Sequence, residues 1–229
     1  MIRPVALLRS LQASKFFVPE FLTLSSLPLF PLQTVLFPEG VLALRVFEVR
    51  YLDMVRRCHE ADAPFGVVAL KQGSEVRQPG ASPEAFNPIG TLARIRALDM
   101  PQPGLLMIQC RGEQRFRVSR TERLKHGLWV ADILQLDDDL TVPVPSDLAY
   151  VAQALTRVLE SLRARSGIED MTPPISAPVR CDDCGWLANR WCELLPIPLE
   201  LKQRLMQLDN PLVRLELVSD ILQRMGISA

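Results

Sequence analysis

Apolar and polar residues alternate with a period of two over most of the chain between Leu27 and about residue 140. This spacing is typical of strands with one buried face. We predict strands at Val41–Val46, Phe65–Leu70, Gly90–Leu98, Leu105–Cys110, Gln114–Ser119 and Leu128–Leu136. Pro101 to Gly104 has the turn residues of a hairpin, and the Gly-, Pro- and Ser-rich segment from Gln72 to Pro88 is expected to be an exposed loop.

One helix is expected to interrupt these strands. Its apolar residues recur at helical spacing, at Tyr51, Met54, Val55 and Cys58. The same spacing places the charged residues largely on the wetter side of the helix, namely Arg50, Asp53, Arg56 and Arg57.

The pattern changes to a helical period after the acidic run at 137–139. One apolar stripe predicts a helix, at Leu148, Val151, Ala152, Leu155, Leu159 and Leu162. A proline-containing linker from Arg165 to Arg180 precedes a second helical face, at Leu187, Ala188, Trp191, Leu194 and Leu195. Asn210 before Pro211 is a typical N-cap, and Gly226 is a typical helix stop. We therefore divide the chain into an N-terminal extension at 1–26, a β-rich region at 27–140 and a helical bundle at 146–226.

The composition is that of a globular protein, because 48% of the 229 residues are apolar and 23% are charged. Lys plus Arg equal Asp plus Glu at 26 each, so no global positive field attracts nucleic acid or an anionic membrane. Pro28, Pro31 and Pro38 exclude a membrane-spanning helix in the apolar stretch from 21 to 38. Residues 1–26 have no cleavage pattern of small residues, so we expect a floppy extension instead of a signal peptide. Five irregularly spaced cysteines favour a reducing cytoplasm over a secreted disulfide scaffold.

Several segments together resemble the N-terminal, substrate-binding domain of the Lon protease family, and especially the free-standing bacterial proteins built from that domain alone. The resemblance runs from about Leu27 to Met225 and rests on the segments Leu27–Gly40, Glu48–Tyr51, Gly90–Ile95, Gly112–Val118, Trp186–Arg190, Leu194–Pro196 and Leu199–Gln203. It implies an α+β fold, in which a mainly antiparallel PUA-like pseudo-barrel is followed by a C-terminal helical bundle.

The resemblance also implies a non-catalytic protein that binds unfolded or degron-bearing polypeptides, as an adaptor or a holdase, with a Lon-type protease as a partner in trans. No Gly-x-x-x-x-Gly-Lys-Ser/Thr motif is present to hold nucleotide phosphates, and no convincing Ser/Lys pair replaces the protease nucleophile, so we expect no enzyme activity and no cofactor. The alternative is an RNA-binding PUA-like module, against which the charge balance and the 6% aromatic content count.

Peptide binding requires an exposed apolar strip or a free strand edge. Phe47 and Arg50, at a strand-to-helix junction, and Met100 and Leu105, which flank a tight turn, are the candidate contacts. In the alternative interpretation Glu48 and Tyr51 have structural roles at the start of the helix, and Met100 and Leu105 are stray surface apolar residues.

Cys181, Cys184 and Cys192 are the only candidate zinc ligands that the spacing suggests. A structural zinc site needs four ligands, so a fourth would have to come from the strand region, from Cys58, His59, Cys110 or His126. The acids at 182 and 183 oppose thiolate formation and so disfavour a redox pair. We expect incidental structural cysteines and no metal.

Overall fold

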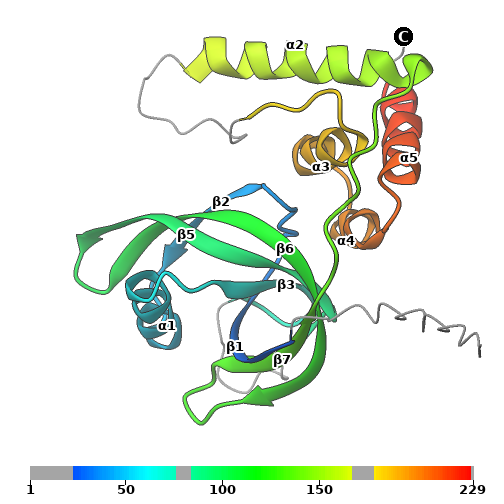
Figure 1. The fold of residues 1–229 in the computed structure, drawn as a ribbon. Coiled ribbons are helices and arrows are strands. Elements are labelled where there is room, and N and C mark those ends of the chain that lie inside the picture. The colour runs from blue at the N-terminus through cyan, green and yellow to red at the C-terminus, as the bar shows by residue number, and fades with distance from the viewer. Residues whose placement is uncertain (1–22, 76–83, 167–177, 228–229) are drawn as a thin grey trace, which may run out of the picture.

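The protein is described by a computed structural model that covers residues 23–75, 84–166 and 178–227. A strand-rich half lies below a helical half, and the chain crosses from one to the other once, after β7 (Figure 1). Most of the expected N-terminal extension, the middle of the expected loop at 72–88 and most of the linker at 165–180 lie outside the described residues.

The strands form a closed, mainly antiparallel ring. They are β1 Thr23–Leu32, β2 Val41–Val46, β3 Phe65–Gln72, β4 Ala85–Phe86, β5 Ile89–Gln102, β6 Leu105–Arg123 and β7 Trp129–Gln135. The order is β1-β7-β6-β5-β3-β4, and a parallel pairing of β1 with β3 closes the ring. β2 lies off this path and pairs with the first half of β6. The predicted pseudo-barrel is confirmed.

β1 was not predicted as a strand, because its prolines obscure the pattern. Pro28 is paired with Val130 of β7, and Pro31 is paired with Val68 of β3. Proline has no backbone N–H to donate to a neighbouring strand. It is therefore found in a strand only at positions where no such donor is needed, and its presence argues locally against a strand. β1 begins at Thr23, inside the segment expected to be an extension.

β6 merges two predicted strands into one. The prediction had separate strands at Leu105–Cys110 and Gln114–Ser119, but β6 continues through Gly112, and its pairing with β2 before that residue is replaced by pairing with β7 after it. A side chain at Gly112 would place its Cβ 2.2 Å from the carbonyl oxygen of Phe37. The glycine is therefore required by a close backbone approach.

The helices beyond β7 form the predicted bundle, and one further helix packs beside the ring. They are α1 Val49–Glu60, α2 Ala149–Ser166, α3 Cys184–Leu194, α4 Leu199–Gln207 and α5 Pro211–Arg224, with a short 3-10 turn at Ser146–Leu148 before α2. Asn210 Oδ1 accepts the amides of Leu212 and Val213 at 3.0 and 3.2 Å, which confirms the predicted N-cap. Among the described residues no helix is long and apolar enough to span a membrane.

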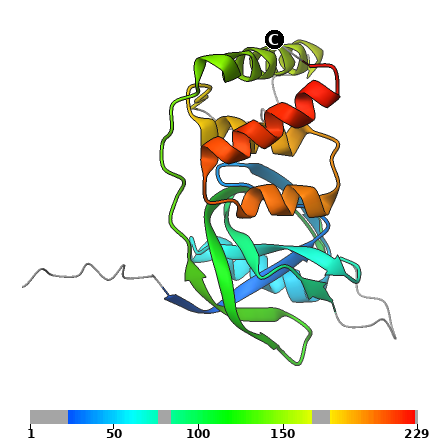
Figure 2. The ribbon, with the colours of Figure 1, turned by 90° about the vertical axis from the view of Figure 1, so that its right-hand side faces the viewer.

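The two halves share a core. The bundle core includes Val35, Phe37, Ala69 and Ile89 from the strand-rich half. Gln203 of α4 also donates to the buried carbonyl of Ile89 at 2.9 Å. Figure 2 shows α4 lying directly on the strands, with α5 above it. The ring and the bundle are therefore held against each other by apolar and polar contacts.

Candidate functional site

Three strand segments extend beyond the ring and form what we call the wing: β2 at 41–46, the outer half of β5 at 94–102 and the first half of β6 at 105–111. One face of the wing is buried on α1 and the ring through Val46, Leu106 and Ile108. The opposite face is more open, and there Met107 is paired with both Arg45 and Asp99. The wing thus presents one uncovered sheet face.

Large apolar side chains are exposed at the end of the wing near the β5–β6 turn. Phe47 is 54% exposed, Met100 55% and Met107 38%. Val46 pairs with Leu106 and Gln102 pairs with Leu105, so the register brings the start of β6 beside both Phe47 and the turn. The predicted contacts Phe47 and half-buried Leu105 are therefore neighbours, and Met100 lies at the same end of the wing, next to Asp99, which pairs with Met107. Met107 was missed, although its position between buried Leu106 and Ile108 is the signal of an outward-facing residue.

Arg50 corrects the prediction that it lies on the wetter side of the helix, because its side chain is only 5% exposed. Its Nη1 donates to the carbonyl of Gly127 at 3.0 Å, and its Nε pairs with Glu48 at 3.1 Å. Nη1 also lies 3.4 Å from Glu84, and the guanidinium stacks 4.5 Å above the ring of Tyr51. Helical periodicity cannot reveal Gly127 and Glu84 as acceptors, because they come from other segments. Arg50 positions the start of α1 and is not available as a surface contact.

Two cavities flank α1. One, of about 630 Å³, lies between α1 and the β6–β7 hairpin and has Met54, Cys58 and Leu128 among its lining residues. The other, of about 280 Å³, runs along β2 and is lined by Ala43 to Glu48 together with Phe30, Leu32, Tyr51 and Glu75. The smaller cavity adjoins the exposed Phe47 and so continues the apolar surface.

A polar crevice of about 540 Å³ separates the ring from the bundle, lined by charged residues such as Arg96, Arg111 and Arg180. Glu39 bridges two of these arginines. Because arginines and carboxylates alternate along its walls, the crevice has no single sign of charge to select an ionic ligand.

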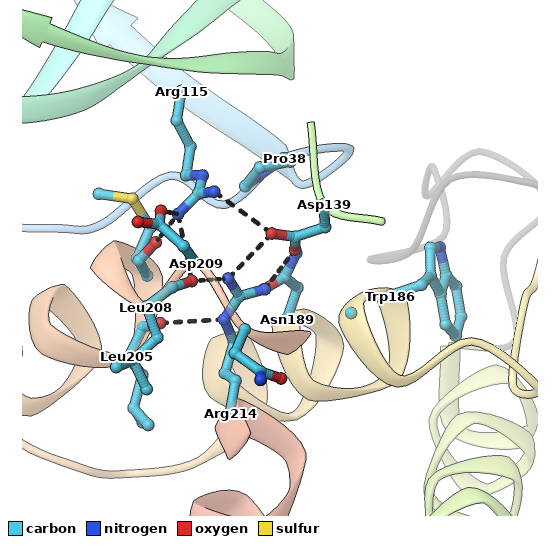
Figure 3. Close-up of polar contacts among 12 residues, drawn as sticks. Pro38, Arg115, Asp139, Trp186, Asn189, Leu205, Leu208, Asp209 and Arg214 are labelled. Carbon is cyan, nitrogen blue, oxygen red and sulfur yellow. Dashed lines mark hydrogen bonds and ion pairs between the residues drawn. The ribbon is translucent and has the colours of Figure 1, made fainter. Parts of the chain in front are cut away.

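In the wall of the crevice, two buried arginines share one carboxylate (Figure 3). Arg115 of β6 donates to Asp139 at 3.3 Å and to the carbonyl of Met206 at 3.0 Å. Arg214 of α5 pairs with both oxygens of Asp139, and also donates to the carbonyl of Leu205 at 3.0 Å. Asp139 thus links strand, linker and helix, and these residues join the two halves of the molecule.

The three zinc candidates do not converge. Cys184 and Cys192 are eight positions apart in α3, which separates them by about 12 Å along the axis, too far for one ion. Burial raises the pKa of the Cys192 thiol to about 12. Cys181 is half-exposed, with Thr156 Oγ1 at 3.9 Å. Within the described ranges no group of three or more His, Cys, Asp and Glu side chains is arranged to hold a metal.

The family model described as the ATP-dependent protease La (LON) substrate-binding domain matches residues 26–224. The chain therefore belongs to the Lon substrate-binding domain family. A crystal structure of a Lon N-terminal domain protein from Xanthomonas campestris is 30% identical, with a TM-score of 0.63, and the match covers 90% of this chain and 100% of that one. The predicted resemblance is confirmed.

Two Lon proteases are similar to this Lon-type domain over part of their length. The Lon protease of Anaeromyxobacter dehalogenans (strain 2CP-C) is 26% identical over 207 residues, and Lon protease 2 of Myxococcus xanthus is 27% identical over 209 residues. Each match covers 86% of this chain but only 23% of the relative. The N-terminal domain of a Mycobacterium avium complex Lon protease shares the fold at 16% identity and a TM-score of 0.53, over 85% of this chain and 96% of that one.

Proposed function

We propose that this protein binds exposed apolar segments of unfolded or degron-bearing polypeptides on the wing, and that it acts by binding without catalysis. The observation that carries this proposal is that Phe47, Met100 and Met107 are all substantially exposed at one end of the wing. Exposed apolar side chains that are close together mark interaction sites in soluble proteins. Membership in a substrate-binding family supplies the class of ligand.

Methionine and phenylalanine suit a binder of varied sequences. Met has three rotatable bonds and a polarisable sulfur, so Met100 and Met107 can repack around different partners. Phe47, two residues before the start of α1, adds a rigid aromatic contact. Such a surface favours broad recognition of apolar segments over one defined sequence.

The proposal is tested with variants of the wing. We expect Phe47→Ser combined with Met107→Ser to weaken binding of an unfolded client by about tenfold or more, since two apolar contacts of about 1 kcal/mol each are lost. The matched control is Leu140→Ser, because Leu140 is an exposed apolar residue in the linker after β7, away from the wing. Binding is measured by fluorescence anisotropy of a labelled client. Equal affinities for the wing variant and the control would refute the proposed surface.

A protein that binds unfolded polypeptides can act as an adaptor or as a holdase. An adaptor would hand its client to a Lon-type protease in trans, whereas a holdase would only delay aggregation. We place this activity in the cytoplasm, where the five free cysteines of the chain remain reduced. Degradation of a client by a purified Lon protease, with and without this chain, separates the two: acceleration supports the adaptor role, and protection from aggregation alone supports the holdase role.

A further inference from the structure

In the described part of the chain, no strand pairs with the outer edge of β2. Within the described part of the chain, β2 pairs only with β6, and its register is unbroken over six residue pairs, from Val41 with Arg111 to Val46 with Leu106. The opposite edge of the wing, on β5, carries register shifts between Ile95 and Ala97 and again before Gln102. Bulges of this kind blunt an edge, whereas a regular edge can accept another strand.

The hydrogen-bond phase shows which backbone groups point outward. The amide of Gly112 donates to the carbonyl of Gly40 at 2.8 Å, directly before the ladder of β2 with β6. Antiparallel pairs alternate between hydrogen-bonded and non-bonded positions. Counting from Gly40, the even-numbered residues of β2 bond to β6, and the backbone groups of Val41, Ala43 and Arg45 point away from it. Ala43 has the smallest side chain of these and is exposed.

The cavity beside β2 lies along this edge. Its lining includes four consecutive residues of β2, from Ala43 to Val46. Neighbouring side chains of a strand point to opposite faces of the sheet, so a cavity that contacts all four lies against the edge of the strand. Phe30, Leu32 and Tyr51 supply its apolar wall. Its volume of about 280 Å³ is just below the roughly 300–1,000 Å³ of small-molecule sites, so it suits one large apolar side chain.

The charges around the cavity favour a basic flank on the ligand. The carboxylates of Glu48 and Glu75 and the guanidinium of Arg45 line it, and Glu48 is already paired with Arg50 at 3.1 Å. Glu75 accepts the amide of Gln33, and it forms no ion pair with another side chain in the resolved ranges. A cationic side chain next to the apolar anchor of a ligand therefore finds an uncompensated carboxylate.

We propose that an extended segment of the polypeptide client adds to the outer edge of β2 as a further strand. It bonds to the backbone of Val41, Ala43 and Arg45, inserts one large apolar side chain into the cavity and places a basic residue near Glu75. This inference rests on the proposed function and deepens it. Backbone hydrogen bonds are independent of sequence, which is what a receptor for varied unfolded chains requires.

The test uses a fluorescein-labelled peptide with a central Phe between Lys residues in an otherwise Ser/Thr sequence, and two versions N-methylated at alternate amides. A strand bonds to its neighbour through every second residue, so methylation in one phase should weaken binding by about tenfold or more, and methylation in the other phase should have little effect. Ala43→Pro removes an outward amide of β2 and should cause a similar loss, whereas the matched control Ala43→Val keeps that amide.

The outcomes separate the two proposals. If the unmodified peptide and an unfolded client both bind, but methylation in either phase has the same effect or none, strand addition is wrong and the proposed function stands. If neither the peptide nor the unfolded client binds, both proposals are wrong. A dimer of this chain that Ala43→Pro abolishes, with peptide affinity unchanged, would assign the edge to a second copy and overturn the inference.

Discussion

Replacing Asp139 by Asn removes the one carboxylate that two buried guanidiniums share. The side chains of Arg115 and Arg214 are 5% and 1% exposed, and both donate to Asp139. Asn keeps one acceptor but loses the charge and the second acceptor. Removing one partner of a buried ion pair costs about 3–5 kcal/mol. Because Asp139 is itself 16% exposed, we expect the lower end, about 3 kcal/mol of unfolding free energy.

The assay is urea unfolding followed by tryptophan fluorescence, with a thermal melt as a second measurement. For a domain of this size a loss of 3 kcal/mol corresponds to a fall in Tm of roughly 6–12 °C. The matched control is Asp138→Asn. Asp138 is exposed and makes one hydrogen bond, to the side chain of Gln114 at 3.3 Å, so its replacement should stay within about 0.5 kcal/mol. Equal stabilities for the two variants would refute the claim that this network holds the ring to the bundle.

Three further predictions concern other parts of the fold. Gly112→Ala should lower the free energy of unfolding in urea by about 2 kcal/mol or more, because its Cβ would lie 2.2 Å from the Phe37 carbonyl oxygen. The control Gly104→Ala lies in open space but at positive φ, and should lower it by only about 1 kcal/mol. Equal losses of stability in the two variants would contradict this prediction. Burial raises the pKa of Glu193 from 4.5 to about 8, so between these pH values the folded state binds a proton that the unfolded state has lost. The free energy of unfolding should therefore fall as the pH rises through this range. Glu193→Gln should reduce this pH dependence, and an unchanged pH dependence in the variant would refute the prediction. In the folded protein iodoacetamide should modify half-exposed Cys181 before the four buried cysteines, which peptide mass mapping would show. Earlier labelling of a buried cysteine would contradict this prediction.

Much of the secondary structure could be predicted because it is encoded locally. The strands of the wing and the helices of the bundle follow from residue spacing, and the cap at Asn210 from residue type. β1 could not be predicted in this way because its pairing with β3 is a contact between distant segments, and its prolines argue locally against a strand. Ring closure was expected only from the resemblance to the Lon family, since periodicity does not specify which strands pair.

The candidate site likewise has residues that the local sequence indicates and residues whose placement depends on distant contacts. Phe47 and Met100 could be picked out as candidate contacts because apolar residues beside a turn or a junction stand out in the sequence, and both are exposed. Arg50 was placed wrongly because its acceptors come from Glu84 and Gly127, far along the chain. The free edge of β2 could not be predicted either, because an edge is defined by the strand that is missing beside it.

The central claim is that this chain recognises polypeptides by their unfolded state. The most direct measurement compares binding of one client in two forms, native α-lactalbumin and the same protein reduced and carboxymethylated so that it stays unfolded, by anisotropy at equal concentrations. We predict binding of the unfolded form alone, without cleavage of the client and without ATP hydrolysis, and a loss of that binding in Phe47→Ser with Met107→Ser. Equal binding of both forms, binding of neither, or cleavage of the client by the purified chain would contradict the account.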